Sequence, residues 1–235
     1  MTSLYRCIVP GATSIVAIAD ACATERRRPS EPNDAAQQRA GITTEMAQQP
    51  LPPAFFEKLY ERDDDPWSFA TSAYESAKYD ASIAALEPRY AAALEVGCSV
   101  GVLTRRLAER CDALLAVDVS ERALATAAAR CSDVPHVRFE RRVLPREFPD
   151  GPFDLIVISE VAYYWSNDDV ALAVERSAAT LRPGGDLLLV HFRPKVDGHV
   201  NGGDDVHARF LAEPRFTRVR GHRADRYRLD VLRRR

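Results

Sequence analysis

Residues 94–110, which read LEVGCSVGVLTRRLAER, constrain the fold of this chain more than any other segment. The run AAALEV is apolar apart from Glu95 and predicts a short buried strand, while the residues after Gly101 have the apolar spacing of a helix. The turn between them is built from small residues that let the backbone pass close beneath a ligand. Open α/β sheets bind ligands at this edge, outside the carboxyl ends of their strands. The segment therefore predicts a strand, a ligand-binding turn and a helix.

The turn has three functional interpretations. The dinucleotide fingerprint G-x-G-x-x-G requires glycine at 97, 99 and 102, where the chain has Gly97, Ser99 and Val102. The nucleophile elbow G-x-S-x-G of hydrolases matches residues 97–101 literally. The pattern E-x-G-x-(G/S)-x-G, in which Rossmann-like methyltransferases bind S-adenosylmethionine, matches from Glu95. A glycine turn without a ligand in an unrelated α/β domain is the remaining interpretation.

The second strand favours the S-adenosylmethionine loop. The segment ALLAVDV ends at Asp118, which lies 23 residues after Glu95. A carboxylate at the tip of the second strand is placed to accept hydrogen bonds from two ribose hydroxyls. A hydrolase has no need of this acid, and its elbow requires several strands upstream of the nucleophile. Little foldable chain precedes Gly97.

Composition bounds the class of protein. The 235 residues suffice for one α/β domain, and a net charge of −2 predicts neither nucleic acid nor a membrane surface as partner. No apolar run approaches the roughly 18 residues of a spanning helix. The cysteines number five, with no Cys-x-x-Cys pair and no zinc spacing, which predicts reduced thiols in the cytoplasm and no metal site.

The first 50 residues differ from the rest. They contain one aromatic residue, Tyr5, and polar stretches that cannot bury a core, so we expect a disordered tail or an over-extended start. A secretory signal over residues 1–23 is an alternative that Pro10 and Asp20 disfavour. We place the domain at 51–235, with helices over 51–90 forming a lid and a core over 91–235.

Apolar periodicity and turn residues predict the remaining elements. We expect helices near 53–62, 100–110, 121–131, 166–182 and 204–211, and a further helix that follows the stretch 67–79 and ends near 86. We expect strands near 94–96, 113–117, 136–140, 153–159, 186–192, 216–223 and 226–234. The β-α alternation followed by an antiparallel pair predicts an α/β fold with a Rossmann-like, seven-stranded, mostly parallel sheet covered by helices on both faces. In the last pair, we expect one face to meet water.

Several segments together carry a family resemblance. EVGCSVG, AVDVS, FDLIVISEVAYYW and LRPGG, at 95–101, 116–120, 153–165 and 181–185, are shared by many class I S-adenosylmethionine-dependent methyltransferases. DPWSFATSAYESAKY at 65–79 resembles D-P-W-x-[YF]-x-T-S-x-Y-E-x-x-K-Y, and GHVNGGDDVH at 198–207 resembles G-H-V-x-G-x-x-x-V. Both patterns are typical of the nodulation protein S family of N-methyltransferases, which the chain resembles over residues 52–233. One departure is Ser99, where many members have a third glycine.

The resemblance implies a Rossmann-like fold, S-adenosylmethionine as methyl donor and an amino-sugar acceptor. In the namesake proteins, that acceptor is the free amine of a de-N-acetylated chitooligosaccharide. Methylation of a hydroxyl or carboxylate, hydrolysis by Ser99, and non-catalytic cofactor or RNA binding remain alternatives. Only the family likeness separates the first of these alternatives from N-methylation.

The expected site residues fall into two groups. Glu95 is expected at the methionine amino group, Asp118 at the ribose, and Arg142 and Val143 at the adenine. The full set of expected cofactor-binding residues is Glu95, Gly97, Cys98, Ser99, Gly101, Asp118, Val119, Arg142, Val143, Ser159, Trp67, Tyr74 and Lys78. Of these, Trp67, Tyr74 and Lys78 are expected in the lid. Glu160, Tyr163 and His199 are the expected catalytic residues, because each is able to assist deprotonation of an amine.

Overall fold

The computed structural model describes residues 50–194, 196 and 199–235 of the chain. The tail expected over residues 1–50, and the alternative secretory signal, therefore lie almost wholly outside the described residues. The same holds for Gly198, the first residue of the predicted GHV segment.

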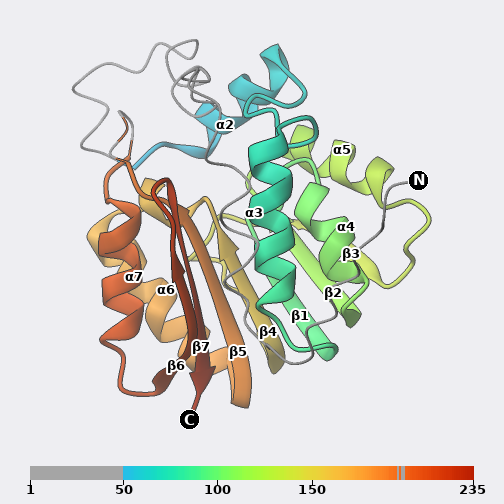
Figure 1. Cartoon of the computed structure of the whole chain (residues 1–235). Coiled ribbons are helices and arrows are strands. Elements are labelled where there is room, and N and C mark those ends of the chain that lie inside the picture. The colour runs from blue at the N-terminus through green and yellow to red at the C-terminus, as the bar shows by residue number, and fades with distance from the viewer. Residues whose placement is uncertain (1–49, 195, 197–198) are drawn as a thin grey trace, which may run out of the picture. The chain divides into compact units, whose positions relative to one another are not determined.

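A seven-stranded sheet with the order β3-β2-β1-β4-β5-β7-β6 forms the centre of the described chain (Figure 1). Its strands are β1 (Tyr90–Val96), β2 (Cys111–Asp118), β3 (Val137–Arg141), β4 (Phe153–Ser159), β5 (Leu181–Phe192), β6 (Phe216–Arg223) and β7 (Tyr227–Arg234). Strands β1 to β5 pair in parallel, and β7 pairs antiparallel with both β5 and β6. This arrangement confirms the predicted mostly parallel, doubly wound sheet.

Helices cover both faces of the sheet (Figure 1). The helices are α2 (Pro53–Arg62), α3 (Ala73–Ala84), α4 (Val102–Ala108), α5 (Glu121–Arg130), α6 (Asn167–Thr180) and α7 (Gly203–Leu211), with a 3₁₀ turn, η4 (Ala162–Tyr164). Helices α6 and α7 share one hydrophobic cluster with β1, β4 and β5. Helices α3 and α4 pack on the other face against alternate residues of the same strands.

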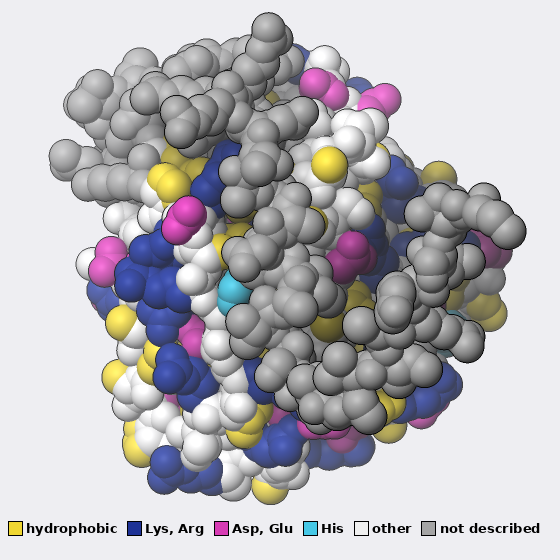
Figure 2. Space-filling model, viewed as in Figure 1, with side chains coloured by type: hydrophobic (Ala, Val, Ile, Leu, Met, Phe, Trp, Pro, Cys, Tyr) yellow, Lys and Arg dark blue, Asp and Glu magenta, His cyan; other side chains and the backbone are white. Residues whose placement is uncertain are grey.

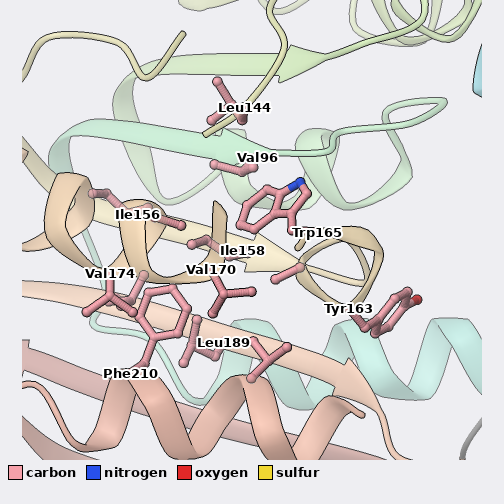
Figure 3. Close-up of a cluster of buried hydrophobic side chains, with 14 of the residues drawn as sticks. Val96, Leu144, Ile156, Ile158, Tyr163, Trp165, Val170, Val174, Leu189 and Phe210 are labelled. Carbon is pink, nitrogen blue, oxygen red and sulfur yellow. The ribbon is translucent and has the colours of Figure 1, made fainter. Parts of the chain in front are cut away.

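The packed face under α6 and α7 forms the larger core. Ile156 and Ile158 of β4 and Leu189 of β5 gather with Val170 of α6 and Phe210 of α7 (Figure 3). All five side chains are fully buried. Burying each such side chain stabilises the fold by about 1.5–3 kcal/mol. Because β4 is buried on both faces, its almost continuously apolar sequence was interpretable as a central parallel strand.

Serine side chains begin three of the helices. Ser72, Ser120 and Ser166 each accept a hydrogen bond from a backbone N–H in the first turn of α3, α5 and α6. Such a cap satisfies one of the amide groups that a helix start leaves without a partner. The predicted capping arrangement at Ser166 is confirmed, because its hydroxyl also donates to the carboxylate of Asp169 at 2.8 Å.

Two local predictions were wrong in detail. We expected α6 to continue into the LRPGG segment and β5 to begin at 186, but α6 ends at Thr180 and β5 already begins at Leu181. Gly184 has φ +82°, and the pairing with β4 shifts register at this point, so the segment is an irregular strand start. Pro183 fits there because it has no backbone N–H to donate to a regular ladder.

The edge strand β6 also differs from expectation. We expected it to bury one face, but every residue after Phe216 is exposed, including Val219. Figure 2 shows Lys and Arg side chains gathered over the side of the molecule where β6 and β7 lie. Arginines alternate with other residues along β6, but this alternation does not correspond to one buried face. The arginines remain in water and form ion pairs there, as Arg220 does with Glu87.

Candidate active site

A cavity of about 280 Å³ lies at the carboxyl ends of β1, β2 and β4. The chain continues from β1 to β2 on one side, whereas β4 and β5 lie on the other, so this edge is the topological switch point of the sheet. The loops after these strands form one wall of the cavity. The segment that contains α2 and α3 contributes the opposite side, with Tyr60, Trp67 and Tyr74.

The turn after β1 approaches the cavity with its backbone. Gly97 has φ +74° and Ser99 has φ +48°, both in the left-handed region. A Cβ atom on Gly97 would lie 3.1 Å from that of Val161, so this position accepts glycine best. Gly101 has a different role. It does not line the cavity, and its missing Cβ lets α5 approach, because a Cβ there would lie 2.9 Å from Ala127.

Asp118 is held beside this turn by backbone hydrogen bonds. The N–H of Ser99 donates to one carboxylate oxygen at 2.9 Å, and the N–H of Ser120 donates to the other at 3.0 Å. Burial raises the pKa of Asp118 above its ordinary value, although these N–H groups act in the opposite direction. The side chain lines the cavity at the end of β2, where the sequence predicted a ribose-binding acid.

Within the described residues, no histidine or carboxylate is hydrogen-bonded to the hydroxyl of Ser99. This hydroxyl forms a 2.6 Å hydrogen bond with the hydroxyl of Tyr60. Among the described residues that line the cavity there is no histidine. A hydrolase elbow requires a base within hydrogen-bond reach of its serine, so the described geometry does not support the hydrolase interpretation.

Glu95 lines the cavity with a buried carboxyl group, and one of its oxygens accepts no hydrogen bond from the described residues. Its side chain is almost fully buried, and Oε2 has no hydrogen-bond partner within the described structure. Burial raises the pKa of Glu95 to about 8. A buried acid without a counter-charge is unfavourable on its own and suits a ligand that brings a cation. The chemistry of this site therefore fits the ammonium group of S-adenosylmethionine.

A cluster of charged residues lies at the end of β4. The ammonium group of Lys78 is 2.5 Å from Oε1 of Glu160 and 2.8 Å from Oε2 of Glu75. The other oxygen of Glu160 accepts hydrogen bonds from the Tyr163 hydroxyl at 2.8 Å and from the backbone N–H of Phe192 at 3.0 Å. Although burial lowers the pKa of Lys78, the two carboxylates outweigh it and raise that pKa above its ordinary value.

Glu160 occupies a strained backbone conformation. Its φ of +55° is rare for a residue other than glycine, asparagine or aspartate. Its backbone N–H donates to the carbonyl of Val190 in β5, which keeps the residue in this conformation. Such strain is common where a fold must aim a functional side chain. Here it aims Glu160 between β4 and the lid helix α3.

The N-terminal lid is ordered by one acid and a row of aromatic rings. The carboxylate of Asp65 accepts the backbone N–H groups of Phe69 and Ala70, both at 2.8 Å. Trp67 stacks on Phe69 with a ring-centroid distance of 5.7 Å and meets Tyr60 edge to face at the same distance. The DPWSFATS segment is therefore a compact turn that places Trp67 against the cavity.

The remaining expected residues divide between the cavity and the core. Cys98, Val119, Arg142, Val143 and Ser159 line the cavity with the residues described above. His199 does not line it. The imidazole of His199 lies behind Tyr163 and stacks on the Tyr163 ring at 3.8 Å, with an angle of 16° between the planes.

Glu75 and Arg226 are among the charged cavity residues that the sequence analysis missed. Glu75 lines the cavity and pairs with Lys78, and Arg226 reaches it from the turn between β6 and β7. Glu75 belongs to the Y-E-x-x-K part of the predicted motif, where the spacing of three residues is the available signal. Arg226 had no such signal, because it is one of many arginines near the C-terminus.

Comparison with known proteins identifies relatives of this chain. The family model described as Nodulation protein S (NodS) matches residues 54–223. Nodulation protein S from Bradyrhizobium diazoefficiens is 33% identical over 163 residues, covering 65% of this chain and 78% of the relative. The solved structure of N-methyltransferase NodS from Bradyrhizobium japonicum, in complex with S-adenosyl-L-homocysteine, superposes with a TM-score of 0.68 at 25% identity, covering 76% of this chain and 97% of that one. An uncharacterized methyltransferase of Mycobacterium tuberculosis, Rv0089, is 30% identical over 130 residues, covering 55% of this chain and 62% of the relative.

The doubly wound sheet, the cavity at its switch point and the acids at the ends of β1 and β2 define an S-adenosylmethionine-dependent methyltransferase. Within that class, the chain belongs to the nodulation protein S family. Within the described residues, no helix is long and apolar enough to cross a membrane.

Proposed function

We propose that this enzyme transfers a methyl group from S-adenosylmethionine to the nitrogen of a small amine, with an amino sugar or chitooligosaccharide as the preferred acceptor class. The main support is the carboxylate of Glu160, which lies at the carboxyl end of β4 and is hydrogen-bonded to Lys78 and Tyr163. The relative whose printed title is N-methyltransferase NodS supports the choice of nitrogen. We further expect the enzyme to act in the cytoplasm, where S-adenosylmethionine is made.

Residues on the β1 and β2 side would hold the cofactor. Glu95 would pair with the methionine ammonium, Asp118 would accept the ribose hydroxyls, and the backbone of residues 97–99 would pack beneath the cofactor. Val119, Arg142 and Val143 would border the adenine. When bound, the cofactor supplies a sulfonium methyl group that is already activated for attack.

The protein must then orient an amine. Holding a lone pair in line with the reacting bond is worth roughly 7–11 kcal/mol. Three donors, from Lys78, Tyr163 and the backbone N–H of Phe192, hold the carboxylate of Glu160 in place. An amine needs only mild assistance with its deprotonation, which Glu160 would give, whereas a hydroxyl group is much less acidic than an ammonium group. This is the reason for preferring nitrogen over oxygen.

His199 acts in this proposal as a positioning residue. Its ring supports the ring of Tyr163 from behind, and it does not border the cavity. Trp67, Tyr74 and Lys78 would cover the reacting groups from the lid side and exclude water. Ser159, at the end of β4, would border the junction of cofactor and acceptor.

Calorimetric titration of S-adenosylhomocysteine tests the cofactor half of this proposal. We expect binding by the wild type and a loss of about 30- to 100-fold in Asp118→Ala, because charge-assisted hydrogen bonds to the ribose are removed. Asp112→Ala is the matched control, since Asp112 is an exposed acid at the opposite end of β2. Equal affinity in all three proteins would show that Asp118 does not bind the cofactor.

Methyl transfer to glucosamine oligomers tests the acceptor half. We expect a methylated amine by mass spectrometry and a strongly reduced kcat in Glu160→Gln, with unchanged affinity for S-adenosylhomocysteine. Methylation of a hydroxyl group instead would overturn the choice of nitrogen. Retention of full activity by Glu160→Gln would remove the catalytic role of Glu160.

A further inference from the structure

Arg226 lies in the turn between β6 and β7 and lines the active-site cavity. Its guanidinium carbon is 4.6 Å from the ring centroid of Tyr74 and 5.6 Å from that of Phe192. These two contacts place the guanidinium group beside α3, the helix that contains Tyr74 and Lys78. Contacts between a cation and aromatic faces hold an arginine without using its N–H donors.

Two donor atoms of Arg226 are buried and form no hydrogen bond in the described structure. Nε and Nη2 are shielded from water and have no hydrogen-bond partner in the described part of the chain. Leaving a buried charged donor unpaired is costly, and folded proteins rarely do so without a functional reason. Two adjacent N–H groups of a guanidinium form a fork that matches a carboxylate or phosphate group.

Neighbouring arginines are paired, in contrast to Arg226. Arg193, Arg223 and Arg228 all form ion pairs with Asp204. Inside the cavity, Glu75 and Glu160 are both engaged by Lys78. Glu75 lies within electrostatic range of Arg226 but forms no hydrogen bond with its Nε and Nη2 atoms, so the described residues leave this guanidinium fork available to a ligand.

We propose that Arg226 binds an oxyanion of the methyl acceptor, so that the acceptor is an amine that also carries a carboxylate or a phosphate group. This inference rests on the proposed function, because it assigns the second charged group of the same substrate. Glu160 would hold the amine end, and Arg226, which like Lys78 contacts the ring of Tyr74, would hold the acid end. Within the proposed class of amino-sugar acceptors, the inference selects those that carry such an acid, because a de-N-acetylated chitooligosaccharide without one leaves this fork unused.

Arg226 is placed for the acceptor rather than for the cofactor. The residues that suit the cofactor, Glu95 and Asp118, lie at the ends of β1 and β2. Arg226 precedes β7, which is separated from β1 by β4 and β5 in the sheet. The carboxylate of the methionine moiety is the competing ligand, and the test below includes it.

The experiment measures binding to the protein saturated with S-adenosylhomocysteine. The probes are D-glucosamine, D-glucosamine 6-phosphate and 2-amino-2-deoxy-D-glucuronate, which share an amine and differ in their acid. We expect at least one acidic probe to bind the wild type about tenfold or more tightly than glucosamine. The stronger of the two acidic probes identifies phosphate or carboxylate as the recognised group.

Three variants test whether Arg226 causes the preference for acidic probes. Arg226→Met should abolish it, and Arg226→Lys should retain only part of it, because lysine keeps the charge but loses the fork. Arg223→Met is the matched control from the same hairpin, since Arg223 is exposed, does not line the cavity, and should leave the preference intact. If Arg226→Met does not fold, an undiminished preference in Arg226→Lys would overturn the proposal.

The controls separate this inference from the proposed function. Equal binding of neutral and acidic probes, or a preference that survives in Arg226→Met, overturns the role of Arg226 while cofactor binding stands. A tenfold loss of S-adenosylhomocysteine affinity in Arg226→Met also overturns it, because Arg226 would then bind the cofactor. Failure of the wild type to bind S-adenosylhomocysteine would overturn the proposed function itself.

Discussion

Glu95 couples the cofactor site to pH. Its carboxyl group is buried, and burial raises its pKa to about 8 from an ordinary value of 4.5. The free protein therefore holds this group protonated at neutral pH. Binding an ammonium group beside it requires the carboxylate, so cofactor binding must release a proton whenever the pH is below about 8.

We predict that the affinity for S-adenosylhomocysteine falls as the pH decreases below about 8 and that Glu95→Gln removes this dependence. Titration calorimetry between pH 6 and pH 9 measures both effects. Glu109→Gln, an exposed acid at the end of α4, is the control and should behave as wild type. A wild-type affinity that does not change with pH would contradict the raised pKa of Glu95.

The carboxyl group of Glu95 also affects the stability of the protein without its cofactor. A carboxyl group whose pKa is raised on folding stabilises the fold below pH 4.5, and this contribution is lost as the pH rises to about 8. Above pH 8, Glu95→Gln should therefore unfold with a free energy about 1–3 kcal/mol higher than wild type. Function at this residue costs stability.

At the scale of elements, three buried side chains join β5, α7 and β7. The backbone N–H of Ala162 donates to Nε2 of His191 at 3.3 Å, so His191 carries its proton on Nδ1 and donates to Nε2 of His207 at 3.1 Å. His207 in turn donates from Nδ1 to Asp230 at 2.7 Å. This chain of hydrogen bonds supports the η4 turn, which carries Tyr163 into the active site.

Both histidines are held neutral. Burial lowers the pKa of His191 and of His207, and Asp230 only partly opposes this for His207. The other titratable groups that act on the pair are His199, Lys78, Arg228 and Asp204. Because the folded protein resists protonating these rings, the stability they contribute is present above pH 6.5 and is lost as the pH falls below it.

We predict that His207→Ala lowers the free energy of unfolding by about 1–3 kcal/mol at pH 7.5 and weakens the loss of stability between pH 6.5 and pH 5. Urea denaturation at several pH values measures this. His222→Ala, an exposed histidine on β6, should leave both quantities unchanged. An acid sensitivity equal to that of wild type in His207→Ala would show that this pair does not cause it.

At the scale of the whole molecule, the N-terminal segment closes the site from above the sheet. Tyr60 of α2 reaches Ser99 in the β1 turn, and Lys78 of α3 reaches Glu160 at the end of β4. These contacts connect the lid to both halves of the site. Because the Lys78–Glu160 pair is buried, removing one partner would cost about 3–5 kcal/mol.

We predict that S-adenosylhomocysteine slows backbone hydrogen exchange over residues 53–72 as well as in the 97–101 turn, because the ligand adds contacts to both sides of the cavity. Exchange measured by mass spectrometry tests this, with α6 as an internal reference that should not change. Asp118→Ala at the same ligand concentration should show no added protection. Protection confined to the 97–101 turn would mean that the lid does not bind the cofactor.

Local sequence patterns were enough to predict most of the elements and their order. Strand β4, the serine-capped starts of α5 and α6, and the turn at Gly97 were predictable because apolar periodicity, caps and turn residues act over only a few positions. The acids Glu95 and Asp118 were also predictable as cavity residues, since parallel strands end at one edge of a sheet.

Which side chains from distant parts of the sequence come into contact depends on the tertiary structure. Lys78 and Glu160 are 82 residues apart in sequence, and the buried chain of hydrogen bonds joins three separate elements. The fold likewise placed His199 behind Tyr163 instead of beside the cavity, and brought Arg226 into it. Such contacts depend on how helices and strands pack, which no local pattern specifies, because the residues involved are neighbours only after the sheet has formed.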